Sequence, residues 1–385
     1  DFAWGVAVDH SGNSFLTGNI ESPSATFGTT TLTNVGGGDV FIVKYDPAGN
    51  EMWAKSSSGS YYDEGESVGT DAAGNCYVTG YFRSPTCTFG STVLTNTNPS
   101  TTNHTMDLFL AKLDASGNIL WAKSAGGLSD EEGKAIRVDD DGSCYLAGSS
   151  KSNPSAFGSF TLTGAGMFLA KFDSGGNVVW AEGSGGNDLG VGTAICFGPS
   201  GKVYSCGYFK AATATFGTHT ISNVNSSTYD IFIVETDTSG NYLSAASEGD
   251  SDNDFAYGVG TDSTGNIYLS GAFRSAAIAF SPLTLTNIHN MYDDFFIAKS
   301  GSLTAVAAEN AAPAIPAWPN PANGDFMITV PGNDALVTIT DAGGELVYSA
   351  RTAGGNQPLH LGSPGLYFVT VLSEGKSSTQ KIIIR

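Results

Sequence analysis

The chain has 385 residues, of which 41% are hydrophobic and 14% charged, and its formal net charge is −20. This length suits two or three globular domains, and the excess of carboxylates argues against nucleic acid and anionic membrane surfaces as partners. No apolar run approaches the ~20 residues that a membrane helix needs, so the chain is not predicted to span a membrane.

The residue pattern favours strands throughout. The 50 glycines and the low charge are typical of strands joined by tight turns. Thr, Val, Ile, Phe and Tyr alternate with small polar residues between Gly, Asn and Asp clusters, and no helical spacing appears. We therefore predict an all-β protein, in which the odd set of five cysteines forms buried free thiols rather than a disulfide framework.

A turn built on Asp and Gly recurs along the first 305 residues. It reads DHSGN at 9, DAAGN at 71, DDDGS at 139, GPSGK at 198 and DSTGN at 262, and a second turn reads DPAGN at 46, DASGN at 114, DSGGN at 173 and DTSGN at 237. The Asp bonds a backbone N–H two residues on, and the Gly takes the left-handed conformation that closes a hairpin. The recurring Asp is thus predicted to be a turn residue rather than a catalytic one.

The segments around these turns predict four strands in each repeat. The first strand alternates bulky and small residues, and the second carries an aromatic followed three residues later by Gly. The third holds a Phe and the fourth a Trp in the first three repeats. The aromatic positions are Phe15, Tyr77, Tyr145, Tyr204 and Tyr268 in the second strand, Phe41, Phe109, Phe168, Phe232 and Phe296 in the third, and Trp53, Trp121 and Trp180 in the fourth.

Sheets of this kind bury two faces against their neighbours, as the blades of a β-propeller do. We predict a β-propeller of about five four-stranded blades over residues 1–305, in which residues 303–306 supply the last strand of the fifth. An open stack, or a larger ring with blades upstream of Asp1, remains as an alternative. The pattern resembles the bacterial β-propeller repeat found in many secreted and surface proteins, a resemblance that implies the fold but not an activity.

The residue pattern changes after the repeats end at residue 305. Residues 306–316 form an Ala/Pro stretch that predicts a linker, and alternating segments over 317–385 predict a small Ig-like β-sandwich. WPNPANGDF, VTITDAGGELV, GLYFVTV and the final KIIIR make this segment similar to the type A C-terminal sorting domain of type IX secretion substrates. The residues that carry the resemblance are Pro319, Asn320, Pro321, Gly324, Asp341, Gly344, Gly365, Tyr367, Lys381 and Arg385.

The resemblance to the sorting domain implies a destination and partners. It implies export through the periplasm to the cell surface or the medium of a Gram-negative bacterium. The implied partners are the type IX translocon and its outer-membrane shuttle and sortase proteins, bound through residues 317–385. The resemblance leaves open whether the domain is cleaved and whether the protein is anchored or released.

Chemistry is sparse in the repeats. A search of the inner strands for acids that break the repeat symmetry, as in five-bladed glycosidases, finds no convincing set. Arg137 does break it and is a candidate for binding an anionic group, although pairing with a local carboxylate is the favoured interpretation. Acids that precede the inner strands are weak candidates for Ca²⁺, with solvated loops as the default, and no other cofactor is predicted. They are Asp63, Glu64, Asp130, Glu131, Asp188, Asp252 and Asp254.

These observations predict an exported, non-enzymatic propeller that presents loops for binding or adhesion to a glycan or a protein. An enzyme that acts on extracellular polysaccharide is the second hypothesis. A structural component of a surface layer or filament is the third.

Overall fold

The computed structural model describes residues 1–99, 104–185, 189–280, 283–287, 292–300, 304–306, 317–330, 334–341, 345–373 and 376–385. The chain divides into two compact units, Asp1–Ala305 and Val306–Arg385. Residues 307–316, most of the predicted linker, lie outside the described residues.

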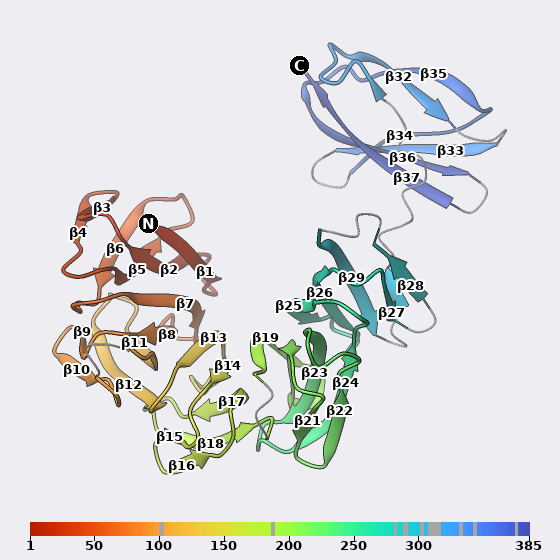
Figure 1. Ribbon diagram of the computed structural model, residues 1–385. Coiled ribbons are helices and arrows are strands. Elements are labelled where there is room, and N and C mark those ends of the chain that lie inside the picture. Colours follow the sequence, from red (N-terminus) through yellow and green to blue (C-terminus); the bar gives the residue numbers. More distant parts are fainter. Residues whose placement is uncertain are drawn as a thin grey trace. The chain divides into compact units, whose positions relative to one another are not determined.

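The first unit contains four antiparallel strands for each sequence repeat, and we call these sets of four blades 1 to 5 (Figure 1). A hairpin of the third repeat, Ser155–Phe157 with Phe160–Leu162, pairs with the last strand of blade 2 and extends that sheet to six strands. In every blade the order in the sheet is the order in the chain. Blade 1 consists of β1 (Phe2–Val8), β2 (Ser14–Ile20), β5 (Asp39–Tyr45) and β6 (Glu51–Ser56); blade 2 of β7 (Asp63–Thr70), β8 (Cys76–Phe82), β11 (Asp107–Leu113) and β12 (Ile119–Gly127); blade 3 of β13 (Glu131–Val138), β14 (Cys144–Ser150), β17 (Gly166–Phe172) and β18 (Val178–Gly183); blade 4 of β19 (Val191–Gly198), β20 (Lys202–Phe209), β23 (Asp230–Asp237) and β24 (Tyr242–Glu248); blade 5 of β25 (Asp254–Thr261), β26 (Ile267–Phe273), β29 (Asp294–Ser300) and β30 (Thr304–Val306).

A small hairpin joins the second and third strands of each blade. The hairpins are β3 (Ser24–Phe27) with β4 (Thr30–Thr33), β9 (Thr86–Phe89) with β10 (Thr92–Thr95), β15 (Ser155–Phe157) with β16 (Phe160–Leu162), β21 (Thr213–Phe216) with β22 (His219–Ser222) and β27 (Ala277–Phe280) with β28 (Leu283–Thr286). The short β30 completes blade 5 with residues 304–306, as predicted for 303–306, while residue 303 lies outside the described residues.

The Asp–Gly turns have the predicted geometry. In the first outer turn, Oδ1 of Asp46 accepts the backbone N–H groups of Ala48 and Asn50 at 2.9 and 2.8 Å. Gly49 closes the turn at φ +83°, and the Asn50 amide donates to Oδ2 of Asp46 at 2.8 Å. The Asp carboxylate therefore replaces backbone partners inside the turn, as a side chain in an Asx turn does.

The Trp of the fourth strand ties each of the first three blades to the next. The indole N–H of Trp53 donates to the carbonyl of Ala115, in the outer turn of blade 2, at 3.1 Å. Trp121 and Trp180 make the same bond to Ser174 and Thr238, at 3.2 and 3.1 Å. One ten-residue segment thus recurs because its Trp recognises the turn of the copy that follows it.

The first strands of the blades pack against one another in chain order and lie on the concave side of an open arc (Figure 1). We call β1, β7, β13, β19 and β25 the inner strands. No sheet packing joins blade 1 to blade 5 within the described residues, so the all-β blade architecture is confirmed and the number of blades in a closed ring stays a prediction. Within the described residues β1 packs against blade 2 on one side only, and Val6 is 68% exposed, whereas Val68 of blade 2 is buried.

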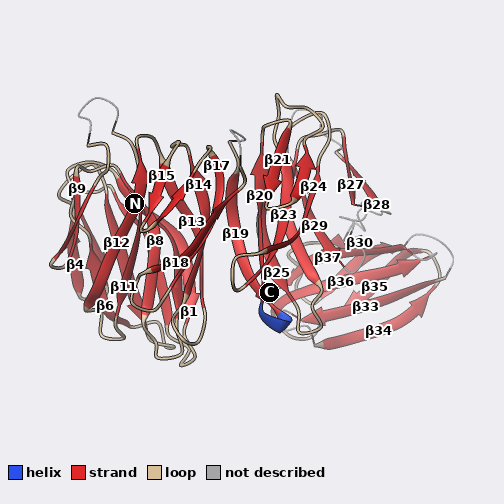
Figure 2. Cartoon of the chain, turned by 90° about the horizontal axis from the view of Figure 1, so that it is seen from below, coloured by secondary structure: helices blue, strands red, loops and turns tan. Residues whose placement is uncertain are grey.

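The second unit consists of two sheets. One contains β31 (Ala317–Trp318), β32 (Asp325–Val330) and β35 (Gly355–His360), and the other contains β34 (Leu346–Thr352), β33 (Ala335–Asp341), β36 (Gly365–Ser373) and β37 (Lys376–Ile384) (Figure 2). Phe326 and Ile328 of the first sheet share a buried core with Ile339, Val369 and Ile382 of the second. This is the predicted β-sandwich. In the part of the chain that the structure describes, no helix has the length and apolarity to cross a membrane.

Candidate functional site

Each inner strand contains a bulge at the same place. The register to the second strand shifts between Ala3 and Gly5 in blade 1, and at the matching positions of the other blades. The Gly of the second strand makes room for it, because a Cβ added to Gly80 would lie 1.9 Å from the carbonyl oxygen of Glu64. The five recurring glycines thus explain the bulge, which re-aims the side chains around it.

The bulge carries residues that differ from blade to blade. The residue at the bulge is Trp4, Glu66, Lys134, Thr193 or Tyr257, and the residue two positions earlier is Phe2, Glu64, Glu132, Val191 or Phe255. We call these ten residues the inner-strand belt. The inner-strand positions on either side of the belt residues hold a buried acid or a small residue in most blades. The residue type therefore varies most between blades at the belt positions.

Charged residues occupy the belt in blades 2 and 3. The ammonium of Lys134 bridges the carboxylates of Glu66, on the neighbouring blade, and Glu132, at 2.9 Å on its own strand. Burial raises the pKa of the Glu66 carboxyl, against the opposing effect of Lys134, and Glu64 and Glu132 add to the rise. Burial acts to lower the pKa of Lys134, but the two carboxylates outweigh it and keep that pKa above its usual value. Lys134 is therefore charged in this cluster.

Aromatic pairs occupy the belt at the two ends of the arc. Phe2 and Trp4 stack with ring centroids 5.8 Å apart, and Phe255 and Tyr257 stack at 6.0 Å. Trp4 is 54% and Tyr257 55% exposed, although each ring stacks on a neighbouring Phe. On the second strand of blade 4, Tyr208 meets Phe255 edge-to-face at 4.9 Å.

Hydrogen bonds connect the aromatic and charged parts between blades 1 and 2. The indole N–H of Trp4 donates to Oδ1 of Asn19 at 3.2 Å, and the Asn19 amide donates to the hydroxyl of Tyr62 at 2.9 Å. The hydroxyl of Tyr81 donates to Glu64 at 3.3 Å. These contacts hold the belt side chains in fixed orientations before any ligand arrives.

Glu66 and Lys134 were not among the residues singled out from the sequence, although acids that break the repeat symmetry were sought on the inner strands. A break in the repeat pattern was visible in the sequence, one position before the small residue that recurs in the inner strand as Gly5, Ser67, Ala135, Ala194 and Gly258. That position holds Trp, Glu, Lys, Thr and Tyr in the five repeats. The residues drew no attention because a regular strand would have placed them on a face buried between blades, and only the bulge re-aims them.

Arg137, which the sequence singled out because it breaks the repeat symmetry, lies exposed on β13. Its guanidinium donates to the carbonyl of Ile136 at 3.4 Å, and within the described residues no carboxylate forms an ion pair with it. The favoured pairing with a local carboxylate is therefore not seen, and the possible role of Arg137 in binding an anion stays a prediction.

The acids that precede the inner strands anchor loops instead of gathering into a cluster. Asp63 accepts the N–H groups of Arg83 and Ser84 at 3.0 and 3.1 Å and the Ser84 hydroxyl at 2.9 Å. Glu131 and Asp254 are anchored in a similar way by Ser152 and Ser275.

Of the remaining acids of this set, Glu64 accepts the hydroxyl of Tyr81, as described above, and the other three have local partners or lie outside the described residues. Asp130 pairs with Lys151 at 3.0 Å, Asp252 accepts the N–H of Asn253 at 2.7 Å, and Asp188 lies outside the described residues. Across the residues that can be placed, no three metal-binding side chains converge. Ca²⁺ binding thus stays a prediction without a preformed site.

Burial shifts the pKa of two of these acids. It raises the pKa of both Asp63 and Glu131 to about 7, and the hydrogen bonds that each accepts only partly offset the rise. The five cysteines are also buried and unpaired, as predicted, and burial raises the pKa of the Cys196 thiol to about 11.

In the second unit, the WPNP segment is bound to the C-terminal strand. The Asn320 side chain donates to the carbonyl of Lys381 at 2.7 Å and accepts the N–H of Ile383 at 3.0 Å. Ala322 exchanges backbone hydrogen bonds with Ile383 and Arg385 at 2.8 and 2.9 Å. The first and last of the four sorting motifs are therefore one structural element.

The other motif residues shape turns and the core. Gly324 adopts φ +93°, buried Tyr367 donates to the carbonyl of Ser363 at 2.9 Å, and Asp341 accepts the N–H of Glu345 at 2.9 Å. Gly365 opens β36, and Pro319 and Pro321 flank Asn320 on the surface. Gly344 lies outside the described residues.

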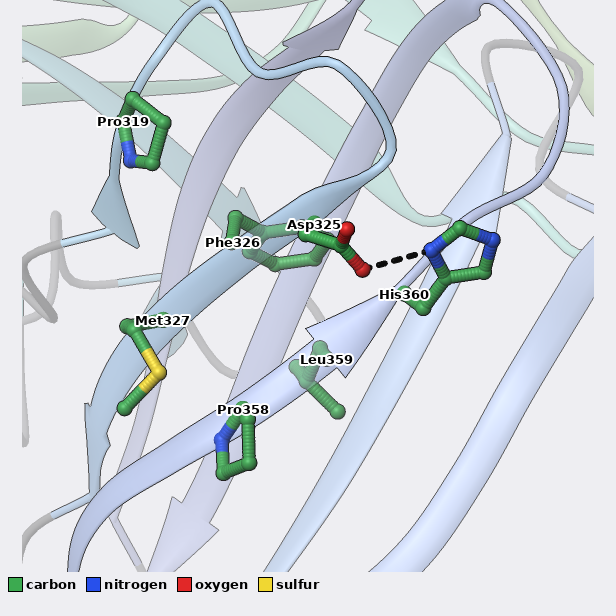
Figure 3. Close-up of a pocket in the computed structure, with 7 residues that line it drawn as sticks. All are labelled: Pro319, Asp325, Phe326, Met327, Pro358, Leu359 and His360. Carbon is green, nitrogen blue, oxygen red and sulfur yellow. Dashed lines mark hydrogen bonds and ion pairs between the residues drawn. The ribbon is translucent and has the colours of Figure 1, made fainter.

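A shallow hollow of about 550 Å³ opens beside the WPNP segment (Figure 3). Its lining is largely apolar, and His360 and Asp325 form a hydrogen bond of 2.7 Å at its rim. The remaining lining residues are Pro319, Phe326, Met327, Pro358 and Leu359.

The second unit can be compared with known families. Residues 316–385 match the family of the secretion system C-terminal sorting domain. This sorting domain indicates export by the type IX secretion system to the cell surface or the extracellular medium of a Gram-negative bacterium, and it implies an interaction with that machinery. The match confirms the localisation that the sequence predicted. It does not extend to the blades.

Two curated proteins share partial similarity with the chain. An uncharacterized WD repeat-containing protein, L264, of Acanthamoeba polyphaga mimivirus is 29% identical over 163 residues, which is 40% of this chain and 12% of that protein. The regulatory protein FlaEY of Caulobacter vibrioides is 31% identical over 143 residues, which is 37% of this chain and 15% of that protein. The similarity thus spans a small part of each relative.

Two solved structures were also found by comparison. One is PorZ, described as an essential surface component of the type IX secretion system of Porphyromonas gingivalis, with TM-score 0.35, 11% identity, and coverage of 99% of this chain and 59% of that one. The other is a family 32 glycoside hydrolase of Bifidobacterium adolescentis, with TM-score 0.31, 10% identity, and coverage of 100% and 75%. At these TM-scores neither carries an argument about activity.

Proposed function

We propose that residues 1–305 are a β-propeller of the bacterial surface repeat type that binds an extracellular ligand without transforming it. The sorting domain delivers this unit and engages the translocon, shuttle and sortase proteins through residues 317–385. The observation that supports a binding role is the inner-strand belt. It places exposed rings and a charged cluster on the concave side of an arc whose other repeated positions serve folding.

The belt supports binding because its chemistry is not required by the blades. Blade 4 has Val191 and Thr193 at the belt positions and still forms its sheet with the same bulge. A folding role would favour one residue type at all five positions, as the recurring Gly of the second strand illustrates. Exposed aromatics beside charged groups are typical of recognition surfaces.

A second candidate function, hydrolysis of a polysaccharide, has one observation in its favour. Glu66 and Glu132 are carboxylates of different blades that meet at one ammonium, and paired carboxylates are the catalytic groups of most glycosidases. Against it, Lys134 holds both carboxylates in ion pairs, which leaves neither as a free general acid. We therefore place binding first.

Binding is tested on the full chain with a printed array of glycans and extracellular proteins, with and without added Ca²⁺. We expect saturable binding that the double variant Glu66→Gln/Lys134→Met lowers at least tenfold, while Lys151→Met, at the exposed Lys151–Asp130 pair, leaves it unchanged. An array that is blank under both conditions would contradict a binding role. Release of soluble sugar from a bound glycan would favour the hydrolase instead.

A further inference from the structure

The inner-strand belt combines exposed aromatic residues with charged hydrogen-bonding groups, and together these limit the classes of ligand that it could bind. At the ends of the arc, Trp4 and Tyr257 are aromatic residues that are more than half exposed. In the middle, Glu66, Glu132 and Lys134 offer fixed hydrogen-bonding groups. A ligand that satisfies both must have apolar faces as well as many polar edges.

The charges of the belt argue against a polyanion or a polycation as its ligand. The belt holds three carboxylates, of Glu64, Glu66 and Glu132, against the one ammonium of Lys134. This excess and the net charge of −20 repel a polyanion. A polycation is disfavoured in turn, because Lys134 already occupies the point where the carboxylates of blades 2 and 3 meet.

A purely apolar ligand is also disfavoured. The side chains of Glu66 and Glu132 are only 11% and 16% exposed, and an apolar ligand would displace the water that still reaches their carboxylates without replacing its hydrogen bonds. The hydroxyls of a sugar replace that water, and carboxylates and an ammonium together accept from and donate to such groups. The apolar face of a pyranose ring stacks on Trp or Tyr in the same geometry that other rings use.

We propose that the inner-strand belt is a binding site for a neutral carbohydrate chain, in which Trp4 and Tyr257 stack against sugar rings and Glu66, Glu132 and Lys134 bond to hydroxyls. This inference rests on the proposed binding function and names its ligand class. The hydrogen bond from Trp4 to Asn19 and the edge-to-face contact of Tyr208 on Phe255 hold the rings in place, which limits the ordering entropy that binding costs.

Isothermal titration calorimetry of the full chain tests the proposal. The probes are cellohexaose, chitohexaose, mannohexaose and maltohexaose, with heparin and spermine as the ionic comparisons. We expect at least one neutral hexasaccharide to bind, with an affinity that changes less than threefold between about 0.05 and 0.5 M NaCl, because no net charge is exchanged. Trp4→Ala and Tyr257→Ala should each weaken it at least tenfold.

Tyr348→Ala is the matched control, because Tyr348 is an exposed tyrosine of the sorting domain and its loss should leave the affinity unchanged. Circular dichroism of each variant checks that the strands are intact. Binding of none of the four hexasaccharides, binding that survives both belt substitutions, or preferred binding of heparin or spermine overturns the carbohydrate assignment. If the hexasaccharides fail while a protein ligand on the array loses affinity in the belt variants, only the carbohydrate assignment falls and the binding function stands.

Discussion

The effect of a single residue in the blades depends on its surroundings as well as on its type. Asp46 and Asp63 are both strand-end acids in the same repeat family, yet one caps an exposed turn and the other lies buried among loop N–H groups. Hydrogen bonds within the turn lower the pKa of Asp46, whereas burial raises the pKa of Asp63 to about 7. The same side chain therefore contributes with opposite sign to the pH dependence of stability.

The raised pKa of Asp63 predicts a loss of stability toward alkaline pH. A carboxyl whose pKa is higher in the folded than in the unfolded state stabilises fully below its ordinary value of 3.8, and this contribution is lost as pH rises through about 7. We expect Asp63→Asn to be more stable relative to the natural protein at pH 8 than at pH 5, in urea unfolding followed by circular dichroism.

Asp46→Asn serves as the control for this pH effect. Its pKa is lowered, so it stays ionised from pH 5 to pH 8 and its difference from the natural protein should be the same at both. A difference for Asp63→Asn that does not change between the two pH values would show that this carboxyl is ionised throughout.

At the scale of elements, a turn that is repeated four times has two different surroundings. Gly49 and Gly117 have nearly the same φ, +83° and +82°, in matching outer turns of blades 1 and 2. Space around Gly49 is open, whereas a Cβ at Gly117 would lie 2.7 Å from the ring of Trp53. The difference arises because Trp53 of blade 1 docks on the turn of blade 2, whereas among the described residues no indole contacts Gly49.

Substitutions at these two glycines therefore distinguish the cost of backbone strain from the cost of losing the contact with Trp53. We expect Gly49→Ala to cost about 1 to 2 kcal/mol of unfolding free energy, because alanine resists the left-handed conformation. Gly117→Ala should cost a further ~1 to 3 kcal/mol because it also displaces Trp53. Urea unfolding of the two variants measures the difference, and equal losses would mean that the indole contact contributes little to holding the blades together.

At the scale of the whole molecule, the two units have separate cores, and the second is the sorting domain. The sandwich of the sorting domain is built from its own residues, Phe326, Ile339 and Val369 among them, and Asn320 ties its first motif to its last strand. A domain with its own core folds without its cargo. Delivery should therefore be transferable to another protein.

A reporter fused to residues 306–385 tests this in a bacterium with a type IX system. We expect the reporter at the cell surface or in the medium, as measured by fractionation and protease accessibility. The same fusion without residues 381–385 removes the carbonyl and N–H groups that Asn320 binds and should stay inside the cell. Retention of the intact fusion in the periplasm would contradict autonomous delivery.

The sequence by itself determined the strands, the turns and the sorting motifs. The Asp-x-x-Gly-Asn turn is set by local hydrogen bonds and by the positive φ of Gly49, and both act within five residues. The same holds for the alternation that predicts the strands, because it records which face is buried. Only the tertiary structure decided the candidate site. Glu66 and Lys134 are 68 residues apart, and nothing local brings them together. The bulge opposite Gly80 and the packing of β7 on β13 do so, as does the order of the blades that leaves Trp4 and Tyr257 exposed.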